Sequence, residues 1–421
     1  MTLQERDKKY LWHPLTQHKL YPNHLGIVKA KGAVLFDENG KQYLDAIASW
    51  YTCMYGHCND YITQKVAVQM QKLDQVVFAG FTHEPAVELS ERLMEILPKN
   101  QQKIFFSDNG STAVEVALKI SLQYHFNKGA KKTKIIALEK GFHGDTFGAM
   151  SASSLSVYNG PFKDFFIDIT RIPVPTQSNF KQVKKLFAEL IAKNQTTAFI
   201  YEPIVQGAAG MKIYSASLLN ELLQLAKTYQ VLTIADEIMT GFGKTGKNFA
   251  SDHLLTKPDI ICLSKSLTAG LVPMAVTSCT EEVYKAFLSD QPEKGFFHGH
   301  TYSANPIACT AALAGLDLLK SSKIQQDIQR IIFSHQQFNK KIKNHAKVKE
   351  TRQIGVIYAL ELKAKMQRYG SLQNRLFNFF MKNGVYLRPL GNTVYLLPPF
   401  ITSQDQLQKI YNTIEKALDA F

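Results

Sequence analysis

The sequence predicts an α/β protein in which a large domain with a mostly parallel β-sheet is joined to a smaller α+β domain made from both termini. Two observations lead to this prediction. Apolar, β-branched runs alternate with amphipathic stretches through the middle of the chain, whereas the two ends show a different order of strands and helices. The chain has 421 residues, 45% hydrophobic and 20% charged, so it is long enough for two domains with real cores.

The middle of the chain supplies the predicted parallel sheet. Amphipathic segments, for example 111–126 and 216–229, lie between short apolar runs at residues 103–107, 134–139, 196–203, 231–238 and 259–264. Strands that alternate with helices favour a parallel sheet buried on both faces, which binds ligands at the carboxyl ends of its strands. Polar residues gather after these runs, at 107–110, 202, 236–237 and 264–265.

The two ends of the chain predict the second domain. Residues 26–46 are typical of short strands joined by turns, and a long helical stretch begins after about residue 325. Strands at 356–362 and 393–399 and a final helix follow it. We therefore expect a large domain at 55–320 and a small α+β domain formed by 1–54 and 321–421.

Several classes of protein are disfavoured by composition. No apolar run reaches the roughly 18 residues that cross a bilayer, and the polar N-terminus lacks the apolar core of a secretory signal, so we expect a cytoplasmic protein without a membrane partner. The five cysteines are odd in number and scattered, which indicates reduced thiols. Cys53, His57 and Cys58 lie close together, but no second cluster accompanies them and we expect no metal site.

The net charge of +14 has two interpretations. A basic nucleic-acid-binding protein is one, but the basic residues are dispersed and no aromatic residues interleave with the densest runs, "KGAKKTK" and "KKIKNHAKVK". Small anionic ligands, such as a phosphate or a carboxylate, explain part of the excess equally well. We therefore expect small-molecule substrates and no nucleic-acid partner.

The segment "GFGKTG" at 241–246 matches the spacing of a dinucleotide-binding loop. The preceding strand ends in Asp236 and Glu237, whose charges would lie close to a pyrophosphate, and no clean helix follows. The same segment resembles a partial P-loop, but Asn248 stands where a magnesium-binding Ser or Thr is needed. An ordinary glycine-rich loop is the better interpretation.

The stretch "SDNGSTAVEVALK" at 107–119 opens an amphipathic helix with small polar residues. Gly110 allows a ligand to approach the backbone closely, and Ser111 and Thr112 offer hydroxyls and amides at a helix N-terminus, where an anion is favoured. A plain helix cap explains the same residues equally well.

Asp236 and Lys265 end consecutive apolar runs, 29 residues apart. Adjacent parallel strands would bring both side chains to one edge of the sheet. Burial lowers the pKa of a lysine and provides a neutral amine, the nucleophile that forms a Schiff base with a carbonyl group. A lone lysine more often extends to solvent, but the acid and the helix start together indicate a pyridoxal-phosphate site.

Longer segments strengthen this interpretation. "LTIADEIMTGFGKTG" followed by "PDIICLSKSLTAG" resembles the signature of the class III, fold-type I, pyridoxal-phosphate-dependent aminotransferases. "GSTAVEVALK", "GFHGDTFGAMS", "YEPIVQGAAGM" and "HGHTYSANPIACTAALAGL" occur in the order expected of that family, so the resemblance covers nearly the whole chain. Segments 11–17, 48–57 and 387–399 resemble the branch that aminates 8-amino-7-oxononanoate in biotin synthesis.

The resemblance implies a role for five cofactor-site residues. Lys265 forms the Schiff base with pyridoxal phosphate and moves the substrate proton, and Asp236 pairs with the pyridinium nitrogen. Gly110 and Ser111 hold the phosphate, and Phe142 stacks on the ring beside the substrate. The reaction is expected to be ping-pong, with the cofactor alternating between its pyridoxal and pyridoxamine forms.

The resemblance also implies an active site completed by a homodimer. His300 and Thr301 reach the phosphate from the neighbouring subunit, while Trp50 and Gly299 line the substrate channel and Arg388 binds the carboxylate of the oxononanoate. A bidentate guanidinium suits that last task.

Two positions depart from the family pattern. Phe142 stands where tyrosine is frequent, which keeps the stacking and loses a hydroxyl contact. Leu15 stands where the best-known members have a substrate-binding tyrosine, so S-adenosylmethionine and lysine both stay open as amino donors. Another class III ω-aminotransferase, acting on ornithine, 4-aminobutyrate or a similar amine, is the rival activity.

Overall fold

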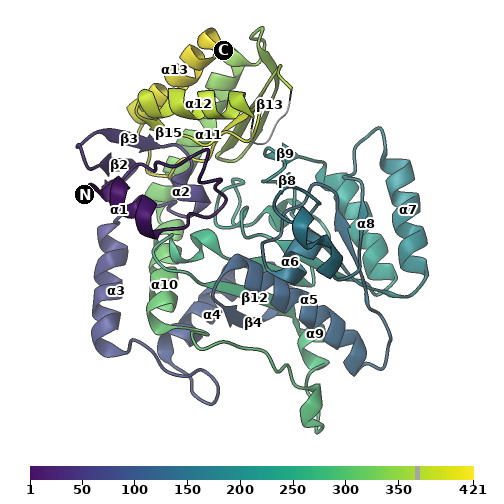
Figure 1. Ribbon diagram of the computed structural model, residues 1–421. Coiled ribbons are helices and arrows are strands. Elements are labelled where there is room, and N and C mark those ends of the chain that lie inside the picture. The colour runs from purple at the N-terminus through teal and green to yellow at the C-terminus, as the bar shows by residue number, and fades with distance from the viewer. Residues whose placement is uncertain (366–369) are drawn as a thin grey trace.

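The computed structural model describes residues 1–365 and 370–421 and is built around a seven-stranded sheet (Figure 1). β12 runs antiparallel to both of its neighbours, and the other adjacent pairs are parallel. The predicted α/β class with a mostly parallel sheet is therefore confirmed. The strand order is β4 (Gln101–Ser107), β12 (Ala275–Thr280), β11 (Ile260–Leu263), β10 (Leu232–Asp236), β7 (Thr196–Tyr201), β5 (Lys134–Leu138) and β6 (Ile169–Ile172).

Both faces of this sheet are buried. Alternate residues of a strand point to opposite faces, and on β10 Ile234 joins the cluster that contains α5, whereas Ala235 joins the cluster that contains α8. Asp236 follows in the same alternation and lies on the face covered by α5. The helices of this part of the chain are α3 (Asp60–Lys72), α4 (Glu84–Ile96), α5 (Gly110–Asn127), α6 (Phe147–Ala152), α7 (Phe180–Ala192), α8 (Ala216–Thr228), α9 (Glu281–Lys285) and α10 (Pro306–Lys320).

The two ends of the chain meet in a second group of elements, seen as purple and yellow segments at the top of Figure 1. One sheet orders β1 (Ile27–Lys31), β2 (Val34–Asp37), β3 (Gln42–Asp45) and β15 (Val385–Tyr386), and the parallel pairing of β15 with β3 joins the C-terminal part to the N-terminal part. A second sheet orders β13 (Val348–Ile354), β14 (Ile357–Leu362) and β16 (Thr393–Leu396). We propose that these strands, with α11 (Ser322–Ile342), α12 (Ser371–Lys382) and α13 (Gln404–Ala420), form the small domain, bounded near residues 54 and 321.

The remaining elements are short. α1 (Leu3–Tyr10) opens the chain, α2 (Ala48–Tyr51) follows β3, and β8 (Val205–Gln206) pairs with β9 (Lys212–Ile213). Among the residues that the structure describes, no helix is long and apolar enough to span a bilayer. Short 3₁₀ turns are η1 (Gly160–Phe165), η2 (Ala250–His253), η3 (Lys265–Thr268) and η4 (Pro292–Lys294).

Candidate active site

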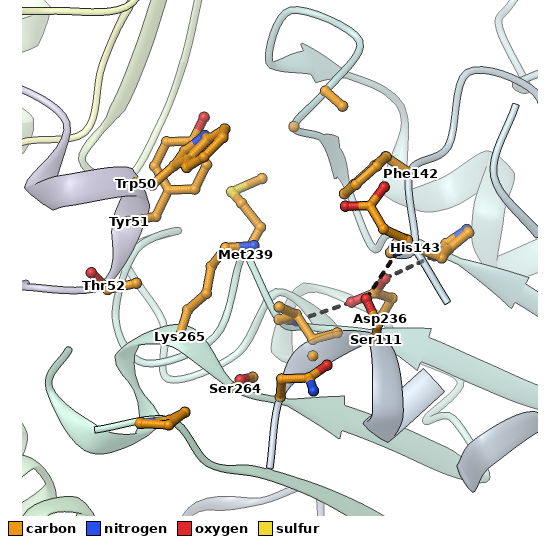
Figure 2. A pocket seen from close by; sticks show the side chains of 18 of the residues that line it. Trp50, Tyr51, Thr52, Ser111, Phe142, His143, Asp236, Met239, Ser264 and Lys265 are labelled. Carbon is orange, nitrogen blue, oxygen red and sulfur yellow. Dashed lines mark hydrogen bonds and ion pairs between the residues drawn. The ribbon is translucent and has the colours of Figure 1, made fainter. Parts of the chain in front are cut away.

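A cavity of about 700 Å³ opens at the carboxyl ends of β4, β10 and β11 (Figure 2). Its walls come from both parts of the chain, since residues 50–52 and 388 line it together with residues of the large sheet. A cavity of this size accommodates a cofactor together with a small substrate. The sequence-predicted residues in its lining are Leu15, Trp50, Gly110, Ser111, Phe142, Asp236, Lys265 and Arg388.

Lys265 extends from the floor of this cavity (Figure 2). β11 ends at Leu263, and Lys265 opens a 3₁₀ turn with φ at +49°, a conformation that a side chain larger than glycine adopts at a cost. Burial lowers the pKa of the Lys265 amine, against the opposing effect of Asp236, Glu202 and Asp145. The fraction of neutral amine near neutral pH is therefore raised, as a nucleophile or proton acceptor requires.

Asp236 is held in place by two hydrogen bonds. Its Oδ2 lies 2.8 Å from Nδ1 of His143, and its Oδ1 accepts a 3.1 Å bond from the backbone N–H of Ile238. Only 4% of Asp236 is exposed, and Figure 2 shows the side chain near Ser111 and Phe142. A buried carboxylate fixed in this way can keep a cationic ring nitrogen of a ligand protonated.

The N-terminus of α5 forms another wall. Asn109 caps the helix by accepting the N–H of Thr112, so the plain cap is confirmed and the anion site stays a prediction. A Cβ added to Gly110 would lie 3.0 Å from the Ile238 side chain, so glycine permits this close packing. The Ser111 hydroxyl accepts a 3.0 Å bond from the backbone N–H of Asp145. The amides and hydroxyl of this helix start suit a phosphate.

Glu202 also lines the cavity, and the sequence predicts only its position after a strand. Its Oε1 accepts the backbone N–H of Phe142 at 3.0 Å, and its Oε2 accepts that of Gly207 at 2.9 Å. Burial raises the pKa of Glu202 to about 7, and Asp236 adds to the rise while His143 and the backbone bonds oppose it. Glu202 thereby fixes the backbone that presents Phe142 to the cavity.

Trp50 reaches the cavity from an unusual turn that the sequence did not predict. Four consecutive residues, 48–51, have positive φ values between +45° and +72°. Left-handed backbone is costly for residues other than glycine, so other contacts must hold this turn. Arg388 packs against it, with its guanidinium carbon 5.2 Å from the centre of the Trp50 ring, a cation–π distance.

Leu15 lines the cavity with φ at +54°, and three other predicted residues lie elsewhere. Gly299, His300 and Thr301 do not appear in the cavity lining of this chain, and Gly299 and Thr301 are exposed. Their exposure leaves the backbone and side chains of this loop accessible to a second molecule.

Two other motifs receive structural explanations. In the loop at 241–246 the Lys244 amine is fully buried and donates to the carbonyl of Gly241 at 2.8 Å, and the loop lies outside the cavity lining. In the segment "CMYGHC" His57 bonds to Asp45, and Cys58 is exposed.

The arrangement fits pyridoxal phosphate. A helix N-terminus for the phosphate, a buried carboxylate for the ring nitrogen and a lysine amine with a lowered pKa all face one cavity. Together with the α/β fold they define the class of fold-type I pyridoxal-phosphate enzymes. The comparisons agree: residues 16–418 match the family of class-III aminotransferases, and the chain belongs to that family.

Relatives match over nearly the full length. The chain is 40% identical to the adenosylmethionine-8-amino-7-oxononanoate aminotransferase of Synechococcus elongatus, over 97% of this chain and 98% of that protein. It is 35% identical to the enzyme of the same name from Staphylococcus aureus, over 99% of this chain and 97% of that protein.

Solved structures also match over nearly the full length of the chain. The enzyme of that name from Methanocaldococcus jannaschii superposes with a TM-score of 0.94 at 32% identity, covering 99% of this chain and 98% of that one. An amine transaminase from an uncultivated Pseudomonas species, solved with pyridoxal phosphate bound, superposes with a TM-score of 0.92 at 27% identity. The match covers 97% of this chain and 98% of that one. Pyridoxal phosphate is therefore the cofactor, and the chain is a transaminase.

Proposed function

We propose that this enzyme transfers an amino group from S-adenosylmethionine to 8-amino-7-oxononanoate and so makes 7,8-diaminononanoate for biotin. The supporting observation is its similarity, over almost the whole of both chains, to enzymes named for this reaction. The donor amine becomes a carbonyl as the ketone of the acceptor becomes an amine, so no further oxidant or reductant is needed. We place the reaction in the cytoplasm.

Lys265 is the residue that moves the proton. When bound, pyridoxal phosphate supplies an electron sink that carries the amino group between two substrates, which use the pocket in turn. The Lys265 amine, with its lowered pKa, would accept a proton from the substrate carbon that bears the amino group and deliver it to the carbon on the other side of the transferred nitrogen. Asp236, oriented by His143, keeps the ring nitrogen charged, and the N-terminus of α5 with Ser111 holds the phosphate.

Arg388 and Trp50 select the acceptor. The substrate is a chain of methylene groups that ends in a carboxylate, and the planar guanidinium of Arg388 can bind that carboxylate through two hydrogen bonds. The stacking of Arg388 on Trp50 holds the guanidinium at the cavity wall and provides an apolar surface for the methylene chain.

A homodimer completes the site in this proposal. Thr301 and His300 would reach the phosphate of the neighbouring subunit, and Gly299 would border its substrate channel. Support comes from the exposure of this loop, where Phe297 and Tyr302 are 79% and 64% exposed. Exposed aromatic side chains of this size are typical of surfaces that pack on a second protein.

The test is a pair of half-reactions with the purified enzyme. S-adenosylmethionine should bleach the visible absorption of the bound cofactor, and 8-amino-7-oxononanoate should restore it, with 7,8-diaminononanoate identified by mass spectrometry. Bleaching by lysine instead would replace the donor, an alternative that Leu15 keeps open. Recovery with 4-aminobutyrate- or ornithine-derived carbonyls, but not with the oxononanoate, would overturn the proposal in favour of another ω-aminotransferase.

A further inference from the structure

Three histidines and one aspartate gather in the N-terminal segment, outside the active site. Asp7 lies on α1, and His13, His18 and His24 lie on the loop that follows. His13 Nε2 is 2.8 Å from Asp7 Oδ1, and His24 Nδ1 is 3.5 Å from Asp7 Oδ2. Among the described residues, only Asp7, His13 and His24 form a group of three potential metal ligands, with the donor atoms of all three within 4.8 Å of one another.

The spacing of these donors suits a tetrahedral ion. Bonds of about 2.0–2.2 Å to imidazole nitrogen and carboxylate oxygen separate neighbouring donors by roughly 3.4 Å. The 3.5 Å between His24 and Asp7 matches this spacing. The 2.8 Å between His13 and Asp7 is a hydrogen bond, which must lengthen when an ion binds. The rings of His13 and His24 stack with centroids 3.6 Å apart, so both rings must turn out of the stack before their nitrogens point at one ion. His18 Nε2 accepts the backbone N–H of His13 at 2.9 Å and fixes the loop.

The donor chemistry selects the class of ion. Calcium and magnesium prefer sites built only from oxygen ligands, whereas two imidazoles and one carboxylate suit zinc and its neighbours among the divalent transition metals. The three side chains are between 15% and 28% exposed, so solvent can deliver the ion.

We propose that Asp7, His13 and His24 bind one zinc-class divalent ion, with a water in the fourth position, and that the ion clamps the loop carrying Leu15. Pro14 and Leu15 lie between two of the ligands and line the active-site cavity. Beyond them the loop is anchored by a 2.5 Å bond from the Asn374 amide to the Tyr21 hydroxyl. The ion would thus fix the cavity wall formed by Pro14 and Leu15 from its outer side, independently of which substrate the cavity takes.

Metal binding itself is the test, using untagged holoenzyme cleared of metal with a chelator and titrated with zinc chloride by calorimetry. We expect one zinc per chain in the wild type and at least about a tenfold loss of affinity in His24→Ala and Asp7→Asn. Both variants should fold, because α1, which carries Asp7, contains no buried residue and the His24 side chain is 27% exposed. The control is His345→Ala, a histidine in a distant turn whose Nδ1 accepts the N–H of Lys347.

Hydrogen exchange tests the clamp on the same samples. Zinc should slow exchange of the amides at 11–25 in the wild type and in His345→Ala, and leave it unchanged in His24→Ala. Equal zinc affinity in Asp7→Asn, His24→Ala and the wild type would overturn the site, as would wild-type affinity weaker than about 0.1 mM. Tight binding without slower exchange would overturn the clamp. None of these outcomes depends on transamination.

Discussion

Asp45 binds His57 through a 2.8 Å bond between Oδ2 and Nε2, and the same carboxylate holds the left-handed turn that carries Trp50. Its Oδ1 accepts the N–H of Ile47 at 3.1 Å, and its Oδ2 accepts the N–H and the hydroxyl of Ser49 at 2.7 and 3.0 Å. One fully buried carboxylate therefore offsets the cost of four residues with positive φ. The position of Trp50 in the cavity depends on this carboxylate.

Asp45→Asn should destabilise the protein by about 2 kcal/mol, because an amide cannot replace both charged acceptor oxygens. Burial alone would lower the pKa of His57, but hydrogen bonds to Asp45 and Cys53 outweigh it and raise the pKa to about 10. Because the pKa of His57 is raised, the stabilisation from its pairing with Asp45 is complete below the ordinary histidine pKa of about 6.5. It is lost as the pH rises through 10. In urea, the free energy of unfolding should therefore be larger for the wild type than for Asp45→Asn at pH 6. This difference should shrink above pH 10. Asp290→Asn, at an exposed site, is the control, and an equal effect there would contradict this account.

The core of the site could be predicted because it depends on strand order. Asp236 and Lys265 follow consecutive apolar runs, and the prediction that these strands are parallel neighbours is confirmed by the register of Asp236 opposite Cys262. The predicted strands at 103–107, 134–139 and 196–203 likewise occur as β4, β5 and β7. Continuous apolar runs carry this information because both faces of the sheet are buried.

Other features depend on contacts that no local pattern contains. β13, "VKETRQI", is polar and lies half exposed, so its pairing with β14 determines its conformation. The left-handed turn at 48–51 contains no glycine, and its cause is a carboxylate outside the turn. The same holds for Glu202, whose role as an acceptor for Phe142 and Gly207 depends on loops that meet only after folding. Tertiary contacts override local preference at these places.

Gly144→Ala should weaken cofactor binding by at least about tenfold. A Cβ at Gly144 would lie 2.1 Å from the Ser111 hydroxyl and 2.9 Å from its Cα, so Ser111 must move away from the proposed phosphate site. Gly144 also has φ at +134°, so the alanine is strained there as well. Gly129→Ala controls for a methyl group added at another glycine of positive φ, here +74°, with open space around it. Fluorescence titration with pyridoxal phosphate measures the affinity, and equal values in the two variants would show that Ser111 is not displaced.

Glu202→Gln should remove a pH dependence of stability. The folded pKa of Glu202 is about 7, above the ordinary 4.5, because burial disfavours the charge. The stabilisation linked to this raised pKa is complete below pH 4.5 and is lost as the pH rises through 7, a difference on the order of 3 kcal/mol. Urea unfolding at pH 5 and pH 8 should show this loss in the wild type and less of it in the variant. Glu293→Gln, at an exposed position, should keep the wild-type slope, and an unchanged slope in Glu202→Gln would refute the assignment.

Arg388→Lys should raise the KM for the oxononanoate by about 100-fold, because an ammonium cannot reproduce the planar, two-bond grip of a guanidinium or its stacking on Trp50. Loss of a charged hydrogen bond, about 1.5–3 kcal/mol, accounts for a change of that size. Bleaching of the cofactor by the amino donor should keep its wild-type rate, since the carboxylate of the donor adjoins its amino group, whereas the carboxylate that Arg388 binds lies at the far end of the acceptor chain. Stopped-flow absorbance separates the two half-reactions. Arg6→Lys on α1 controls for the general effect of replacing an arginine with lysine. Equal slowing of both half-reactions would instead indicate that Arg388 supports the turn of Trp50 and does not bind the acceptor carboxylate.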